Sequence, residues 1–426
     1  MPEFPRRNKM GMGGGTVKVA FFNDTYHPYV SGVITSMERF ASSLKDAGHQ
    51  VMLVVPGHIA APSREHQSRG VYELFSIPVP GFDGMRIGTP IMSDGHLSLS
   101  KRLDEGIDII HAHSPFVVGR MGARLAEKRD VPLVFTCHSI YPNYSDYVPL
   151  MSELAGDVIR EYVVDYCSRC DLILAPSQYV RSVLWEWGVS RDIRVLPSGI
   201  EIEELDRARR EVEDSPEAVR RSLVDSMEIP REATLLLFVG RLDHRKNIDF
   251  LFDVLNRLPL QLRAELVVVG EGPARSQLIE QAAERGVSRR VHFAGKLPFD
   301  EVARWYAASD VFCFPSQIET QGLVLVEAMA AGLPVVALES PTSEETVEDG
   351  INGLLAPGDP GAFAERIHSL LDRPEMAEEL RKAGLKEAAA FSNEALTAKL
   401  IGYYEALVKE TAIRRAKGGP ALGRPL

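Results

Sequence analysis

The chain has 426 residues, of which 45% are hydrophobic and 25% charged, the composition of an ordinary globular protein. This length predicts two domains of roughly 200 residues each. The formal net charge of −11 argues against a nucleic-acid partner.

The charge is unevenly distributed along the chain. Residues 1–200 contain 20 Lys and Arg against 21 Asp and Glu, a net of −1, which leaves 28 against 38, a net of −10, for the remainder. No run of about 18 apolar residues occurs, and residues 1–15 lack the apolar core of a secretory signal. Four cysteines are too few for a disulfide framework. We therefore predict a cytoplasmic protein that begins with a disordered leader over 1–15.

Strand patterns alternate with helix patterns, which predicts parallel sheets covered by helices on both faces. The first strand, 16–22, runs into the loop NDTYHPYVSGV and then into a helix from about 33 to 47. Gly32 lies at this junction, where a backbone N–H can meet a phosphate, although a plain turn glycine remains the alternative. No GxGxxG fingerprint follows the strand, which disfavours a dinucleotide-dependent dehydrogenase.

Three histidines follow or end the next strands, 108–111 and 132–137. His111 and His113 alternate in the sequence, so we expect them to point to opposite faces and not to form a chelating pair. His138 follows the second strand at its carboxyl end, where doubly wound sheets bind their ligands. A satisfied core or surface histidine is the alternative for His138.

The segment LPSGIE contains two helix and strand breakers, Pro197 and Gly199, and is the predicted hinge between domains. The first domain is predicted over 16–197 and the second over 198–394, followed by a terminal helix over 395–412 and a disordered tail over 413–426. Within the second domain, the highly charged stretch 201–227 predicts a solvated linker helix.

Basic residues and glycines follow two strands of the second domain. Arg241 and Lys246, in GRLDHRKNID after strand 234–239, are placed to neutralise a diphosphate, although solvated surface cations remain the alternative. After strand 266–269 comes the tight turn Gly-Glu-Gly-Pro, which contains Glu271.

The stretch SQIETQGLVLVEAMAAGLPVVAL contains a predicted helix, 322–331, between two apolar runs. Glu319 lies in the loop before this helix and Glu327 lies within it. The free N–H groups of Gly322, Leu323 and Val324 at the helix start favour an anion or a sugar hydroxyl.

The pattern Glu-x7-Glu, with Gly-Leu-Val inside and Gly-x-Pro-Val-Val after it, closely resembles the donor-sugar motif of retaining glycosyltransferases with the GT-B fold. The resemblance covers the chain from Val17 to about Ala412. It implies two Rossmann-like domains that face each other across a cleft, with the N-terminal domain on the acceptor side, the C-terminal domain binding a nucleotide sugar, and the terminal helix crossing back to the first domain.

The resemblance also implies a role for each candidate residue. Glu319 would meet hydroxyls of the transferred sugar, Glu327 would hold the nucleotide ribose, and His138 would contact the sugar near the reacting carbon. The remaining donor-binding positions would surround the diphosphate and nucleotide: Gly32, Gly240, Arg241, Lys246, Glu271, Gly322, Leu323 and Val324. The family loop that contains Gly32 usually has two glycines, and the first of them is Ser31 here.

The implied reaction transfers a hexose from a nucleotide diphosphate with retained anomeric configuration. The cations and helix N–H groups would stabilise the departing phosphate, no Asp-x-Asp metal motif is present, and no cofactor besides the donor is expected. Because only Glu319 is left near the sugar, we expect front-face transfer assisted by the leaving phosphate, without a glycosidase-type carboxylate pair. UDP-glucose is the favoured donor, with GDP-mannose and other UDP-hexoses open. An epimerase, a phosphorylase and a non-catalytic sensor are the alternatives to a transferase.

The acceptor is predicted from a narrower resemblance. DTYHPYVSGVITS, HSPF, the tyrosine-rich segment after His138 and ETQGLVLVEAMA resemble the diacylglycerol glucosyltransferase branch, with Cys137 and Ser139 as departures. This implies a lipid acceptor and peripheral contact with the inner face of the membrane, through apolar residues of 75–91 and 140–154. A soluble sugar or polyol acceptor is the alternative.

Overall fold

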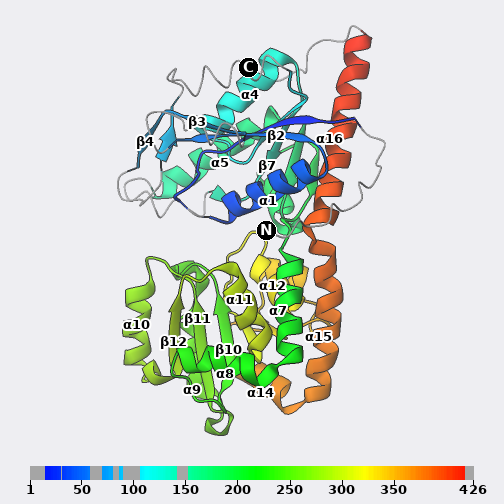
Figure 1. Cartoon of the computed structure of the whole chain (residues 1–426). Helices are drawn as coiled ribbons and strands as arrows, with labels where there is room; N and C mark the ends of the chain where they lie inside the picture. The colour runs from blue at the N-terminus through cyan, green and yellow to red at the C-terminus, as the bar shows by residue number, and fades with distance from the viewer. Residues whose placement is uncertain are drawn as a thin grey trace. The chain divides into compact units, whose positions relative to one another are not determined.

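The computed structural model describes residues 15–29, 31–57, 70–79, 86–89, 106–141 and 152–417 (Figure 1). They form two compact units, of which unit 1 comprises residues up to Gly199 and from Glu394 onward, and unit 2 comprises Ile200–Asn393. Most of the predicted leader, the end of the predicted tail and parts of the two predicted membrane-facing segments, 80–85, 90–91 and 142–151, lie outside the described residues.

Unit 1 is built on a seven-stranded parallel sheet in the order β3-β2-β1-β6-β7-β8-β9. Its strands are β1 (Lys18–Phe22), β2 (Gln50–Pro56), β3 (Val71–Leu74), β6 (Ile109–Ala112), β7 (Leu133–Thr136), β8 (Leu172–Ala175) and β9 (Ile193–Val195). Alternate residues enter opposite layers: Val19 and Phe21 of β1 join one apolar cluster, whereas Ala20 and Phe22 join the other. Both faces are therefore buried, as the apolar runs predicted.

Helices cover both faces of this sheet. The cluster on one face contains side chains of α1 (Gly32–Asp46) and α16 (Asn393–Ala416). The cluster on the other face contains side chains of α4 (Val117–Arg129), α5 (Ser152–Ser168) and α6 (Gln178–Glu186). A short antiparallel pair, β4 (Ser76–Pro78) and β5 (Arg86–Gly88), lies outside the main sheet.

The terminal helix is longer than predicted. It runs from Asn393 to Ala416, so the first residues of the predicted tail at 413 are helical. Leu400 and Tyr404 are buried against the sheet of unit 1. Near the end of the helix, Arg414 donates to the Asp130 carboxylate over 2.6 Å, and Arg415 also pairs with Asp130. These ion pairs hold the last turn of α16 at the end of α4.

Unit 2 is built on a six-stranded parallel sheet in the order β12-β11-β10-β13-β14-β15. Its strands are β10 (Thr234–Val239), β11 (Ala264–Val269), β12 (Val291–Gly295), β13 (Val311–Phe314), β14 (Val335–Leu338) and β15 (Leu354–Ala356). One apolar cluster contains side chains of α9 (Phe250–Arg257), α10 (Arg275–Glu284) and α14 (Pro360–Asp372). The other contains side chains of α7 (Ile202–Asp214), α8 (Pro216–Ser226), α11 (Phe299–Ala308) and α12 (Leu323–Ala330).

The prediction of a solvated linker helix over 201–227 was wrong. The stretch forms two helices, α7 and α8, which are separated at Ser215 and followed by Pro216 at the start of α8. Leu205 and Leu223 are buried in the core of unit 2. The prediction failed because the charged residues of α7 lie on its outer face, while its apolar residues pack into the core.

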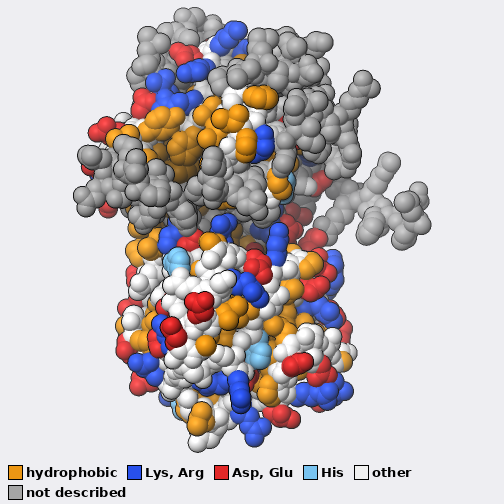
Figure 2. Space-filling view, turned by 90° about the vertical axis from the view of Figure 1, so that its left-hand side faces the viewer, with side chains coloured by type: hydrophobic (Ala, Val, Ile, Leu, Met, Phe, Trp, Pro, Cys, Tyr) orange, Lys and Arg blue, Asp and Glu red, His pale blue; other side chains and the backbone are white. Residues whose placement is uncertain are grey.

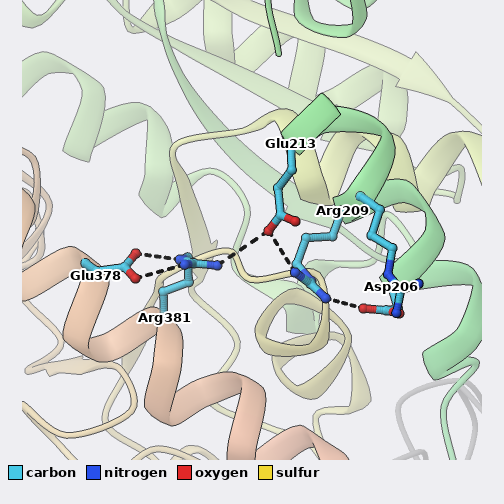
Figure 3. Close-up of polar contacts among 6 residues, drawn as sticks. Asp206, Arg209, Glu213, Glu378 and Arg381 are labelled. Atoms are coloured by element: carbon cyan, nitrogen blue, oxygen red, sulfur yellow. Dashed lines mark hydrogen bonds and ion pairs between the residues drawn. The ribbon is translucent and has the colours of Figure 1, made fainter. Parts of the chain in front are cut away.

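Those charges form a network between α7 and α15 (Pro374–Ala388), drawn in Figure 3. Arg209 pairs with Asp206 and, over 2.7 Å, with Glu213 on the same helix. Glu213 also lies 3.9 Å from Arg381 of α15, which pairs with Glu378 over 2.7 Å. Hydrogen bonding from Arg381 lowers the pKa of Glu378 to about 2. The network fastens α7 to unit 2 at the surface.

Candidate active site

Each sheet has one point at which the strand order reverses, and the candidate residues follow strands near these points. In unit 1 the reversal lies between β1 and β6, and in unit 2 between β10 and β13. Loops that leave neighbouring strands in opposite directions open a crevice at the carboxyl edge of such a sheet, which is where open α/β proteins bind ligands.

In unit 2, the structure brings together Lys246 and Glu319, which are 73 residues apart. Lys246 ends the short 3₁₀ helix His244–Lys246 after β10, and Glu319 lies in the loop after β13. The lysine Nζ forms an ion pair with Oε1 of Glu319, and both side chains are largely buried, with 26% and 16% of their surface exposed. The two charges of this partly buried pair attract each other, so an anion that binds Lys246 must compete with Glu319.

Arg241 differs from Lys246 in its surroundings. It lies directly after Gly240 at the carboxyl end of β10, and its side chain is exposed. Within the described part of the chain no ion-pair partner of Arg241 is present. Its guanidinium is therefore available to an anionic ligand, with five N–H donors in a planar fork.

The loop that contains Arg241 packs on the turn that contains Glu271, backbone against backbone. The Leu242 N–H donates to the Glu271 carbonyl over 3.0 Å, and the Ala274 N–H donates to the Leu242 carbonyl over 3.1 Å. A Cβ atom on Gly270 would lie 1.9 Å from the carbonyl oxygen of Gly240, so only glycine permits this approach. The carboxylate of Glu271 is exposed and lies 3.5 Å from Arg275.

Gly272 provides a test of this close packing. Its Cβ would lie 2.2 Å from the Leu242 carbonyl oxygen, and its backbone has no positive φ that would add strain of its own. We expect Gly272→Ala to lower the free energy of unfolding by about 1–3 kcal/mol, the usual cost of overpacking. The control is Gly402→Ala in α16, where a Cβ meets nothing within 4 Å and a helical alanine is favourable. Denaturant unfolding measures both, and equal stability of the two variants would contradict the packing argument.

The start of α12 presents backbone N–H groups, as predicted, although the helix begins at Leu323 rather than at Gly322. Gly322 is the N-cap residue with a left-handed φ of 67°, a conformation that glycine adopts without a steric penalty. Helix geometry leaves the N–H groups of Leu323 and Val324 without a partner inside the helix. They can donate to an anion or a hydroxyl at this end of the sheet.

Glu327 is held inside unit 2 by a residue that the sequence analysis missed. Its side chain is buried, and its Oε2 accepts a hydrogen bond from the Tyr306 hydroxyl of α11 over 3.2 Å. Burial raises the pKa of Tyr306 well above its usual value, with a further contribution from the Glu327 charge, so the phenol stays a neutral donor. No spacing rule connects two residues on different helices, so no sequence signal could have identified Tyr306.

In unit 1, Gly32 is the first residue of α1, and Ser31 caps this helix through a hydrogen bond from the Ile34 N–H. A second missed residue, Asp24, fastens the loop that precedes them. The Asp24 carboxylate accepts from the Ser114 hydroxyl over 2.6 Å and from the Val118 N–H over 2.7 Å, at the start of α4. Burial raises the pKa of Asp24. The contact joins the loops after β1 and β6 at the reversal point of the sheet.

His138 is buried just past the end of β7, and it belongs to a cluster of three histidines. The prediction that His111 and His113 point to opposite faces was wrong, because their rings stack with centroids 4.3 Å apart. Residues two positions apart in an extended segment lie on the same side of it, so alternation along β6 and the residue that follows places His111 and His113 together. Among the described residues no three His, Cys, Asp or Glu side chains form a group that could hold a metal ion.

The fold class of the protein follows from its similarity to known structures. The structure matches that of HepE from Anabaena in complex with UDP, with a TM-score of 0.72 at 20% identity, over 92% of this chain and 100% of that one. It also matches the sucrose-phosphate synthase of Thermosynechococcus elongatus, with a TM-score of 0.71 at 22% identity, over 92% and 100% of the two chains. Together with the two parallel α/β sheets, these neighbours confirm the predicted GT-B fold class.

The family follows from the sequence comparisons. Residues 219–387 match the model of glycosyl transferases group 1, and residues 30–204 match that of glycosyltransferase family 4. The chain belongs to the group 1 glycosyltransferases and is a glycosyltransferase.

Individual relatives differ in what their names say they transfer. The alpha-monoglucosyldiacylglycerol synthase of Streptococcus pneumoniae is 28% identical over 88% of this chain and 83% of its own length. That of Acholeplasma laidlawii is 25% identical over 90% and 98%. The D-inositol 3-phosphate glycosyltransferase of Xylanimonas cellulosilytica is 32% identical over 72% and 73%. The first two belong to the branch that the loop motifs resemble.

Proposed function

We propose that this enzyme transfers glucose from UDP-glucose to the hydroxyl group of a diacylglycerol-type lipid, with retention of the anomeric configuration and without a metal ion. The observation that carries the proposal is the arrangement at the reversal point of the unit 2 sheet. There the partly buried Lys246–Glu319 pair, the exposed Arg241 and the start of α12 follow neighbouring strands.

The chemistry follows from the charges. When the bond between the sugar and the diphosphate breaks, negative charge develops on the departing phosphate. Lys246, Arg241 and the N–H groups of Leu323 and Val324 supply positive charge and hydrogen-bond donors for it, and in a preorganised site such groups lower the barrier strongly. Glu319, which leaves Lys246 when the phosphate binds, is then free to accept hydrogen bonds from the sugar hydroxyls. Glu327, steadied by Tyr306, holds the ribose.

The identity of the donor is supported by the relatives. HepE, whose structure matches over nearly the whole chain, was solved with UDP, with UDP and glucose, and with UDP-glucose. The two glucosyldiacylglycerol synthases are named for glucose transfer. A retained configuration is consistent with the presence of one carboxylate, Glu319, beside the diphosphate cations, because transfer then proceeds on the face of the leaving phosphate.

The lipid acceptor is supported by the surface of unit 1. Figure 2 shows hydrophobic side chains gathered on the face of this unit that also carries β4 and β5. Ile77 and Ile87 are directly opposite each other in that strand pair and are 50% and 41% exposed. Apolar side chains so placed can enter the interfacial region of a bilayer. No helix in the described parts of the chain has the length and apolar character needed to cross a membrane.

A soluble acceptor is the second candidate, favoured by the D-inositol 3-phosphate glycosyltransferases among the relatives, one of which is 32% identical. The two are separated by incubating the enzyme with UDP-glucose and either diacylglycerol in liposomes or inositol 3-phosphate. We expect glucosyldiacylglycerol with an α-linkage, identified by NMR, and full activity in EDTA. Turnover of the soluble acceptor alone would refute the lipid proposal, and a β-linked product would refute retention.

Membrane contact is tested separately by co-sedimentation with liposomes. Because the proposed contact is made by apolar side chains, binding should depend only modestly on salt. Ile77→Ser with Ile87→Ser should reduce sedimentation, whereas Leu260→Ser, at an 80% exposed position in unit 2, serves as the matched control. Equal sedimentation of both variants and the wild type would contradict a role for the β4–β5 pair.

A further inference from the structure

The three histidines of unit 1 form a continuous stack in which His113 is the middle ring. Its centroid lies 4.3 Å from that of His111 and 5.3 Å from that of His138, and the planes are nearly parallel, at 27° and 17°. Nδ1 of His113 lies 3.0 Å from Nε2 of His138. The ring of His113 therefore makes a direct hydrogen bond to the histidine that the sequence analysis placed in the active site.

The outer end of the stack is fixed by two hydroxyl groups. Nδ1 of His111 is 2.6 Å from the Tyr404 hydroxyl of α16, and its Nε2 is 2.7 Å from the Thr136 hydroxyl of β7. Phe21 of β1 packs against both His111 and His113, with centroids at 5.2 and 4.7 Å. The ring of His113 thus packs against Phe21 and His111 on the sides that do not face His138.

The direction of the hydrogen bond follows from the other nitrogen of His113. Nε2 is fully buried and has no hydrogen-bond partner in the described part of the chain. A buried N–H without an acceptor is rarer in proteins than a buried lone pair without a donor. The proton of His113 therefore belongs on Nδ1, and this N–H donates to Nε2 of His138.

All three rings are neutral at physiological pH, so the positions of their protons matter. Burial lowers the pKa of His138 to about 4 and that of His111 to about 3. Burial also lowers the pKa of His113 well below its usual value, with smaller contributions from its two neighbours. A neutral imidazole has one donor and one acceptor, and its hydrogen bonds select which nitrogen holds the proton.

We propose that His113 is a positioning residue that keeps the proton of His138 on Nδ1, so that His138 presents an N–H donor to an oxygen of the bound sugar donor. Nε2 of His138 is occupied as an acceptor, and Nδ1 has no partner among the described residues. The first half of this inference, the position of the proton on His138, concerns the ligand-free protein alone. The second half, the contact of that N–H with the sugar donor, rests on the proposed function.

The first half is tested by NMR of the imidazole nitrogens in the full chain without ligand. The ¹⁵N shifts and two-bond couplings report which nitrogen is protonated, and His138→Phe assigns the His138 signals by their loss. We expect a protonated Nδ1 on His138 in the wild type, and a change towards protonated Nε2 in His113→Phe. A His138 protonated on Nε2 in the wild type, or an unchanged pattern in His113→Phe, would overturn the proposal.

Two further variants separate positioning from general support of the fold. His113→Asn places an amide donor near the former Nδ1 and should retain a protonated Nδ1 on His138. Tyr404→Phe removes the partner of His111 Nδ1 but keeps the His111–Thr136 and His113–His138 bonds, so it should lower stability by about 1–3 kcal/mol without changing the tautomer of His138. A change of tautomer in Tyr404→Phe as large as in His113→Phe would indicate a merely structural role. If His113→Phe does not fold, the wild-type and Asn spectra still decide.

The second half is tested at His138 itself, by steady-state kinetics with UDP-glucose. An asparagine amide reaches the position of Nδ1, whereas a glutamine amide reaches that of Nε2. The kcat/KM of His138→Asn should therefore be at least about 10-fold higher than that of His138→Gln. The reverse order would overturn the assignment of Nδ1 as the donor. A confirmed tautomer in a protein that transfers no sugar to either acceptor would refute the proposed function and leave the positioning role intact.

Discussion

Lys246→Ala is expected to reduce kcat by about 10²-fold or more, the usual scale for removing a preorganised group that stabilises developing charge. Arg241→Ala should have an effect of similar size, because its exposed guanidinium has no competing partner in the described residues. Steady-state kinetics with UDP-glucose measures both. The matched control is Arg245→Ala, since Arg245 adjoins Lys246 but pairs with Asp243, with Nε and Oδ1 3.1 Å apart.

The ion pair with Glu319 complicates the interpretation of Lys246→Ala and also provides a sharper experiment. Removing the lysine leaves a largely buried carboxylate without its cation, which is unfavourable whether or not Lys246 contacts the donor. The double variant Lys246→Ala with Glu319→Gln removes that unpaired charge. If its kcat returns to near the value of Glu319→Gln alone, the lysine acts only as a partner for Glu319. We expect it to remain about 10²-fold lower, and near-normal kcat of both Lys246→Ala and Arg241→Ala would refute the clamp.

The second large effect is expected from the two glutamates of the Glu-x7-Glu motif. Glu327→Ala should weaken the binding of UDP by about 10- to 100-fold, because a charged hydrogen bond to the ribose is lost. Glu319→Ala should not weaken UDP binding, because it releases Lys246 for the diphosphate, but it should reduce turnover of UDP-glucose. Calorimetry with UDP and kinetics with UDP-glucose measure the two effects.

Tyr306→Phe is the control for the first of these effects, since it removes the hydroxyl that steadies Glu327 and keeps the carboxylate. It should weaken UDP binding less than Glu327→Ala does. Equal losses of UDP affinity in Glu319→Ala and Glu327→Ala would refute the division of roles between the loop and the helix.

The positions of the candidate residues along the chain were predictable because they follow strands. Lys246, Glu319 and His138 all lie shortly after a buried apolar run, and parallel strands place their carboxyl ends at one edge of a sheet. Such features depend only on neighbouring residues, so a single sequence contains them.

Three predictions were wrong, each for its own reason. The charged stretch 201–227 was predicted to be solvated because charge is conspicuous, whereas the few apolar residues on one face of a helix decide where it packs. His111 and His113 were assigned to opposite faces, although residues two positions apart in an extended strand lie on the same face. The end of α16 was placed too early because the Asp130 that holds Arg414 is 284 residues away.

By itself, the sequence determined that helices alternate with buried parallel strands, because the period of apolar residues specifies which elements form and which faces they bury. The GT-B fold class was predicted from the resemblance of the Glu-x7-Glu motif to a known family. Only the tertiary structure decided which side chains meet: Lys246 with Glu319, Tyr306 with Glu327, and Tyr404 with His111. Each of these pairs joins residues on different elements. Whether two such residues meet depends on how the helices pack on the sheets. The periodicity of a single element does not specify that packing.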